Sequence, residues 1–193
     1  LVTLKDFNLD QPQPDAQLTL AKLNQPTGDV KPGDTIDYTL VFANKGGNAA
    51  FFSVNDTLPS QVSLESTQQG DWKFENKDPN LKWYNNTPPF YTFGNTDALG
   101  TPGFIKVRVK VKEGVPSGTT ICNKAWLQDV STQTKKTRDW SPTQVCNTVR
   151  ITCPDGQVLN PQGTGCETVK VPKVVCDSLK VIKEDTRTKR TFK

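Results

Sequence analysis

Hydrophobic and polar residues alternate along short runs of this chain, and clusters of Gly, Pro, Asn and Asp separate the runs. A period of two is the spacing of a half-buried β-strand, and helical periodicity is nearly absent. The clearest run is 104–112, with Ile105, Val107, Val109 and Val111 on one face and Lys106, Arg108, Lys110 and Lys112 on the other. We predict strands at 17–23, 34–44, 50–57, 71–75, 81–85, 104–112, 119–128 and 143–151. This pattern predicts an all-β chain folded as a two-sheet β-sandwich.

Composition divides the chain into four expected segments. Residues 1–15, which contain Gln11-Pro12-Gln13-Pro14, are expected to form a lead or linker, and residues 16–151 the sandwich. Residues 152–175 are too polar to bury a core of their own, so we expect a connector closed by cysteines. From residue 176 to residue 193 the sequence is strand-like again and indicates the first strand of a truncated following module.

Histidine and methionine are absent from the 193 residues. Histidine is the commonest metal ligand and the usual general base near neutral pH, and no carboxylate pair or cofactor motif replaces it. We therefore predict that the protein is not an enzyme and uses no cofactor and no metal. No run approaches the roughly 20 apolar residues that a membrane helix needs, so we predict no membrane span.

The net charge of +4 is concentrated at one end of the chain. Residues 168–193 hold eight basic and three acidic residues, a local charge of +5, so the other residues sum to −1. A nucleic-acid-binding protein would carry a basic face on its folded body, and this pattern predicts no such partner.

The five cysteines are Cys122, Cys146, Cys153, Cys166 and Cys176. None belongs to a Cys-x-x-Cys pair, and their spacing favours disulfides formed in an oxidising compartment, which implies export. We favour Cys122 with Cys146, both outward-facing by strand parity, and Cys153 with Cys166. A different pairing that involves Cys153, and reduced cysteines in a cytosolic protein, are the alternatives. Cys176 is left without a partner.

Several short motifs carry a resemblance to a known family. A Pro-Gly-Asp turn at 32–34 precedes an alternating strand that ends in Asn-Lys-Gly, and it is followed by Asp-Thr-Leu-Pro at 56–59 and Gly-Thr-Thr-Ile-Cys-Asn-Lys-Ala at 118–125. Over residues 16–149 this order resembles the bacterial surface-protein repeat known as domain of unknown function eleven. The resemblance implies an immunoglobulin-like sandwich on exported, wall- or envelope-attached proteins, and no enzymatic activity. The tail from Cys176 is similar to the opening of polycystic-kidney-disease-type repeats.

Strand parity places three polar residues among inward-facing hydrophobic ones: Lys22 beside Leu18 and Leu20, Asp56 beside Phe52 and Val54, and Asn123 beside Ile121 and Ala125. Burial favours the uncharged forms of lysine and aspartate, and a neutral amine is a nucleophile. If Lys22 lies against the Asn123 carboxamide while protonated Asp56 polarises its carbonyl, the amine can displace ammonia and leave an isopeptide bond. Such crosslinks are known in pilin and adhesin sandwiches.

Ordinary structural roles compete with this hypothesis. Lys22 could extend to water near a strand end, Asp56 could cap a turn, and Asn123 could satisfy backbone groups. Asn147 is a rival acceptor for the lysine, and Asn44 is a weaker one.

Aromatic residues cluster between residues 72 and 93. Aromatic rings stack on sugar faces, so Trp83, Tyr84 and Tyr91 are candidate ligand-binding residues. Packing is the stronger interpretation for most of the cluster, because Trp72 alternates with Phe74 as core residues do.

We therefore expect a non-enzymatic structural or stalk module of an exported bacterial cell-surface protein, adhesin- or pilus-like and self-crosslinked. Its partners would be neighbouring modules of the same protein. The alternative is an adhesin domain that recognises a host protein or glycan through the loops at one end of the sandwich. Both hypotheses place the protein outside the cell.

Overall fold

The computed structural model of the chain describes residues 16–47, 49–84, 102–131 and 134–170. These residues form β-strands and no helix, and no segment among them could cross a membrane as a helix. The first seven strands are β1 (Leu18–Gln25), β2 (Gly28–Val30), β3 (Thr35–Asn44), β4 (Ala49–Thr57), β5 (Val62–Gln68), β6 (Lys73–Lys77) and β7 (Asn80–Tyr84). The others are β8 (Gly103–Val111), β9 (Thr120–Ser131), β10 (Thr137–Asp139), β11 (Thr143–Val149), β12 (Gln157–Leu159) and β13 (Cys166–Thr168).

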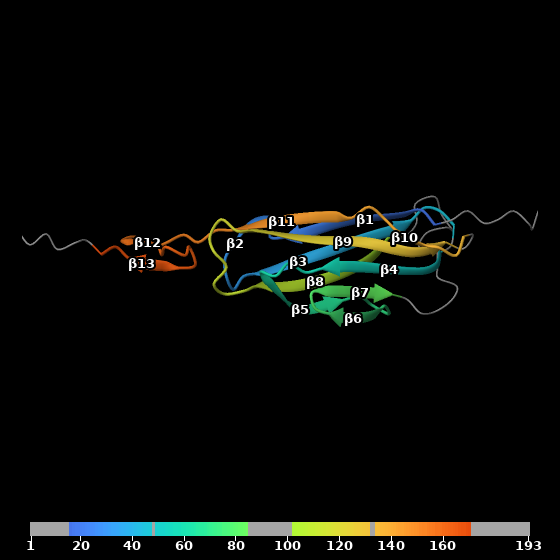
Figure 1. The fold of residues 1–193 in the computed structure, drawn as a ribbon, viewed down its shortest axis with the longest axis horizontal. Helices are drawn as coiled ribbons and strands as arrows, with labels where there is room; N and C mark the ends of the chain where they lie inside the picture. Colours follow the sequence, from blue (N-terminus) through green and yellow to red (C-terminus); the bar gives the residue numbers. More distant parts are fainter. Residues whose placement is uncertain (1–15, 48, 85–101, 132–133, 171–193) are drawn as a thin grey trace, which may run out of the picture.

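Two sheets pack face to face as an elongated sandwich (Figure 1). The first sheet has the order β1-β3-β8-β5, and the second has the order β2-β11-β9-β4-β7-β6, with β10 paired to β9. All pairs are antiparallel except the parallel pair of β2 and β11. The prediction of an all-β, immunoglobulin-like two-sheet sandwich is confirmed.

The core lies between the two sheets and follows from the alternation in the sequence. In β8, Ile105, Val107 and Val109 are fully buried, whereas the charged residues between them face solvent. Tyr38 on β3 and Trp83 on β7 are the largest side chains of the core, and both are fully buried. Burying an aliphatic or aromatic side chain contributes about 1.5–3 kcal/mol, so this layer holds the two sheets together.

The predicted strand list is incomplete. It lacks β2, β5, β10, β12 and β13. β5 is an edge strand with an irregular register between Leu64 and Ser66, and Val62 is its only buried residue, so the hydrophobic alternation does not continue beyond Leu64. The other four have three residues each, which is too short for a period to show.

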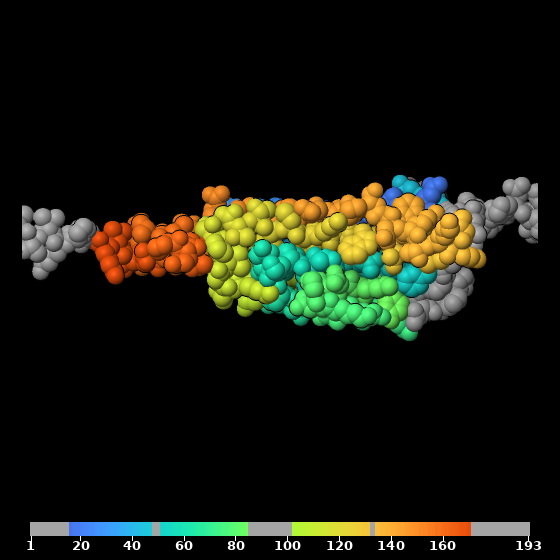
Figure 2. Space-filling view, viewed as in Figure 1, coloured from blue at the N-terminus to red at the C-terminus, as the bar shows by residue number. Residues whose placement is uncertain are grey.

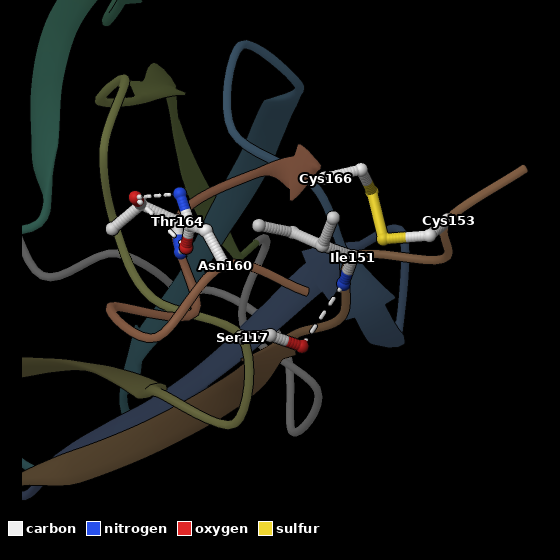
Figure 3. Close-up of a disulfide and its surroundings, with 6 residues drawn as sticks. All are labelled: Ser117, Ile151, Cys153, Asn160, Thr164 and Cys166. Carbon is white, nitrogen blue, oxygen red and sulfur yellow. Dashed lines mark hydrogen bonds between the residues drawn. A yellow bond between two sulfur atoms is a disulfide. The ribbon is translucent and has the colours of Figure 1, made fainter. Parts of the chain in front are cut away.

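A small hairpin of β12 and β13 extends from one narrow end of the sandwich (Figures 1 and 2). The Cys153–Cys166 disulfide closes it, and Ser117 bonds both to the hairpin loop and to Ile151, which precedes the hairpin; Figure 3 shows the disulfide and the bond to Ile151. The Ser117 amide donates to the Gly163 carbonyl at 2.8 Å, and its hydroxyl accepts from the Ile151 amide at 3.1 Å. The expected lead and the expected following module at 176–193 lie outside the described residues.

Candidate functional site

Lys22 points into the core from the middle of β1. Its neighbours Ala21 and Leu23 face solvent, so strand alternation turns the Lys22 side chain inward. The residue is 4% exposed, and its Nζ atom lies 4.7 Å from the centre of the Tyr38 ring. Extension of the lysine to water, the competing interpretation, is therefore wrong.

Asp56 faces Lys22 from the second sheet. β4 places Asp56 opposite Ala125 of β9, with its side chain directed into the core. The Nζ atom of Lys22 donates a hydrogen bond to Oδ2 of Asp56, and both side chains are completely buried. This ion pair joins β1 to β4 across the sandwich, so Asp56 does not serve as a turn cap.

Asn123 is the third buried polar residue of the site. It lies two positions before Ala125 on β9 and on the same face, which brings it diagonally next to Asp56. Neither its Oδ1 nor its Nδ2 atom has a conventional hydrogen-bond partner, and Oδ1 of Asp56 and the Tyr38 hydroxyl also have none. Buried polar groups are almost always paired, so such a cluster of unpaired atoms needs an explanation.

Burial dominates the electrostatics of the site. It lowers the pKa of Lys22 and raises the pKa of Asp56, and in each case the charge of the partner opposes the shift without cancelling it. The Asn123 side chain also opposes the rise in the pKa of Asp56. Burial, followed by the nearby Asp56 charge, raises the pKa of the Tyr38 hydroxyl, so it stays protonated. Each shift makes the uncharged form of its group easier to reach than it is in water.

The residue types and their burial suit one reaction. A neutral lysine amine can attack the carbonyl carbon of a carboxamide when a neighbouring acid polarises the carbonyl oxygen and water is excluded. Lys22, Asn123 and Asp56 would be the nucleophile, the acceptor and the acid. Among the described residues, no three His, Cys, Asp or Glu side chains gather as metal ligands would.

The two rival acceptors are fully occupied by other bonds. The Nδ2 atom of Asn147 donates to the carbonyls of Pro26 and Gly28 at 2.9 and 3.0 Å, and its Oδ1 accepts from Asn24 at 2.9 Å. Asn44 holds the turn that follows β3, where its Nδ2 donates to the Gly47 carbonyl at 2.7 Å. Each asparagine thus has a structural role, whereas Asn123 has none of these bonds.

Both predicted disulfides are present. Cys122 and Cys146 face each other in register on β9 and β11, with their Cα atoms 4.1 Å apart. Cys153 and Cys166 close the terminal hairpin, with their Cα atoms 5.5 Å apart. Cys153 therefore pairs with neither Cys122 nor Cys146, and Cys176 lies outside the described residues.

The prediction that Trp83 binds a ligand is wrong. Trp83 is fully buried, its ring stacks on Phe74, and its Nε1 donates to Thr67 at 3.1 Å, so it belongs to the core. Tyr84, the next residue, faces outward and is partly exposed beside Phe51. Tyr91 lies outside the described residues.

Sequence reasoning missed a second buried charge. Asp129 of β9 is fully buried at the end of the sandwich where β1 begins, and it accepts hydrogen bonds from Arg138 and from the Trp140 indole. In the sequence, Asp129 has the same strand parity as Leu127 and Ala125, and this pattern would have predicted that it faces the core. Arg138 lies on a three-residue strand, so nothing in the sequence indicated the partner.

Sequence reasoning also missed a surface hollow of about 640 Å³ beside the Cys122–Cys146 disulfide. Trp126, Trp140, Pro59 and Lys124 are among its lining residues. It lies on the second sheet, and neither Trp83 nor Tyr84 is among its lining residues.

No protein-family model matches the sequence, and no curated protein matches it either. Solved structures do match the fold. The major pilin subunit BcpA of Bacillus cereus is 14% identical with a TM-score of 0.55, and the match covers 70% of this chain and 41% of that one. The full-length major pilin SpaD of Corynebacterium diphtheriae is 15% identical with a TM-score of 0.52, and the match covers 68% of this chain and 35% of that one.

These likenesses establish a shared sandwich fold. The chain spans less than half the length of either pilin, so a whole pilin's assembly and partners do not transfer to it directly. Because no family model matches, the resemblance to the domain of unknown function eleven stays a prediction.

Proposed function

We propose that this chain is a non-enzymatic structural module of a bacterial cell-surface protein, of the adhesin or pilus type, stiffened by a self-made isopeptide bond. The observation that carries the proposal is the buried group of Lys22, Asp56 and Asn123, whose amide atoms have no other hydrogen-bond partner. The sandwich fold shared with two major pilins supports it. The two disulfides support an extracellular location, because such bonds persist in oxidising compartments.

The proposed reaction joins Lys22 to Asn123. Lys22 passes its proton to Asp56, and the neutral amine attacks the Cγ atom of Asn123 while the Asp56 carboxyl hydrogen-bonds to Oδ1. The Lys22 nitrogen then gives one of its two remaining protons to the carboxamide nitrogen, relayed by Asp56, and the intermediate expels ammonia, so one amide C–N bond forms and one breaks. The balance is one amine plus one primary amide giving one secondary amide plus ammonia. No oxidant or cofactor takes part.

This bond would give the module mechanical strength. Hydrophobic packing and hydrogen bonds between β1 and the rest of the sandwich can be pulled apart, whereas an amide bond between β1 and β9 cannot. A module that carries or spaces a binding tip from the cell needs this property. Its partners would be neighbouring modules of the same surface protein, one of which would begin near Cys176.

The finer assignments belong to the same proposal. Residues 16–151 would be one immunoglobulin-like repeat related to the domain of unknown function eleven. Residues 152–175 would connect it to a module of the polycystic-kidney-disease type. The hydrogen bond from the Ser117 amide to the Gly163 carbonyl supports a connector that is held against the sandwich.

High-accuracy intact mass of the full chain, with and without reduction, tests the crosslink. The proposal expects the wild type to weigh one ammonia less than its sequence, beyond the hydrogens lost in disulfides. Asn123→Ala and Lys22→Ala should restore the sequence mass. Asn147→Ala, the matched control, should still show the deficit, because Asn147 is occupied by backbone bonds. A folded wild type with its full mass would overturn the proposal.

A further inference from the structure

Asn123 and Cys122 are adjacent residues on opposite faces of β9. Asn123 points into the core, diagonally next to Asp56, whereas the sulfur of Cys122 is bonded to Cys146 on the outer side of the sheet. The proposed Lys22–Asn123 crosslink and the observed Cys122–Cys146 disulfide therefore meet at a single peptide bond, the one between Cys122 and Asn123. One crosslink leads from there to β1, where the described chain begins, and the other leads to β11, the last strand of the sandwich.

The direction of the strands makes this junction mechanically relevant. β1 begins at one end of the long axis, and the terminal hairpin extends from the opposite end (Figure 1). Tension along the chain would thus pull β1 and β11 in opposite senses along the sandwich. In an uncrosslinked sandwich, the ladders of β1 with β3 and of β11 with β9 would carry this load.

We infer that the two crosslinks form a covalent bypass, through which tension crosses the sandwich from Lys22 to Asn123, over one peptide bond to Cys122, and then to Cys146. This inference rests on the proposed isopeptide bond. Between Lys22 and Cys146 only that peptide bond is in the load path. The roughly 100 residues from Lys22 to Asn123 and the 24-residue span from Cys122 to Cys146 are removed from it.

The Cys153–Cys166 disulfide continues the same arrangement into the hairpin. It removes a further 13-residue span from the load path, and only the short stretch between Cys146 and Cys153 is left between the two disulfides. The bypass has two kinds of link, one stable to reductants and one cleaved by them. The extensibility of the module therefore depends on redox conditions, whereas its protection between Lys22 and Asn123 does not.

Each link predicts its own length change, because an extended chain spans about 3.3–3.6 Å per residue. Loss of the Lys22–Asn123 bond frees about 340 Å, loss of the Cys122–Cys146 bond frees about 80 Å, and loss of the Cys153–Cys166 bond frees about 45 Å. These three lengths are different enough to be told apart in single-molecule extension.

The test is force spectroscopy on the full chain, held by handles at both ends, with the crosslinks of each sample first counted by intact mass. The oxidised wild type should show none of the three extension steps. A thiol reductant should add the steps of about 80 and 45 Å and no longer one. Asn123→Ala should show the step of about 340 Å without reductant.

Two double variants complete the test. Cys122→Ser with Cys146→Ser should show the step of about 80 Å, and the matched control, Cys153→Ser with Cys166→Ser, should show about 45 Å. A wild type that carries all three crosslinks by mass and still extends by about 340 Å would overturn the bypass alone. A wild type without the ammonia deficit would remove the proposed crosslink, and the bypass with it. The mass measurement separates these two failures.

Discussion

The Nζ atom of Lys22 in β1 donates a hydrogen bond to Oδ2 of Asp56 in β4, so one completely buried ion pair joins the two sheets of the sandwich through the core. A buried pair of this kind is seldom retained for stability alone, because desolvation of both charges offsets their attraction. Its position beside an unpaired carboxamide gives it a chemical use.

Replacing Asp56 by alanine should abolish the crosslink and destabilise the fold. In place of the amide, the variant holds a free Lys22 amine that is buried without its partner, which costs about 3–5 kcal/mol of unfolding free energy. Urea unfolding and intact mass measure the two effects. Asp37→Ala, which breaks an exposed pair with Arg108, is the control and should cost less than about 1 kcal/mol. Equal losses of unfolding free energy for Asp56→Ala and Asp37→Ala would contradict the assignment of Asp56 as the buried partner of Lys22.

In the uncrosslinked variant Asn123→Ala, the contribution of Asp56 to stability should fall as the pH rises from acidic values toward neutrality. Burial raises the pKa of Asp56 in the folded state above its usual 3.8, so the folded state holds this proton more tightly than the unfolded chain does. That contribution is complete below pH 3.8 and is lost as the pH rises through the folded pKa.

Unfolding free energies of Asn123→Ala, compared with those of Asn123→Ala combined with Asp56→Asn, isolate this contribution, because asparagine does not titrate. A difference that grows in favour of Asp56 with rising pH would show that attraction to Lys22 outweighs burial.

Removing the Cys122–Cys146 bridge should lower the unfolding free energy by about 3 kcal/mol, because the bridge restricts a 24-residue span of the unfolded chain. The variant Cys122→Ser with Cys146→Ser, compared with wild type in urea, measures this loss. No change in the urea midpoint would mean that the bridge carries load without stabilising the fold at rest.

Trp83→Ala should cost about 3–5 kcal/mol, since it removes the largest side chain of the core. Its neighbour Tyr84 faces outward, so Tyr84→Ala should change the unfolding free energy by no more than about 1 kcal/mol. Thermal or urea unfolding of both variants measures these losses. A small loss of unfolding free energy for Trp83→Ala would contradict its place in the core and favour a surface role.

Arg138→Ala should cost about 3–5 kcal/mol, because Asp129 would lose its cationic partner while fully buried. Arg150 pairs with Asp29 at the surface, so Arg150→Ala is a matched control and should cost less than about 1 kcal/mol. If urea unfolding gave the same small loss of free energy for Arg138→Ala and Arg150→Ala, water or another group would have to replace Arg138 as the hydrogen-bond donor to Asp129.

Strand parity predicted which residues would meet in the core. The alternation of β1, β4 and β9 places Lys22, Asp56 and Asn123 inward, and the structure brings Lys22 and Asp56 into an ion pair. The same argument placed Cys122 and Cys146 outward on paired strands, where they form a disulfide. Parity works here because the period of a strand is fixed by its backbone and does not depend on distant residues.

Strand parity alone could not show which inward-facing asparagine side chain lacks hydrogen-bond partners. Asn147 and Asn123 both point inward, and only the position of the Pro26 and Gly28 carbonyls shows that Asn147 is already bonded. The prediction that Trp83 binds a ligand was wrong for a different reason. Its residue type suggested a sugar-binding ring, whereas its alternation with Leu81 already marked it as a core residue. The edge strand β5 has too few buried positions for a pattern to show.

Proteolysis of the oxidised chain followed by tandem mass spectrometry tests the central claim most directly. We expect one branched peptide in which the Lys22 side chain is joined to the Asn123 side chain with loss of ammonia, and no such peptide from Asp56→Ala. Recovery of the Lys22 and Asn123 peptides only as separate, unmodified species from folded wild-type protein would contradict it.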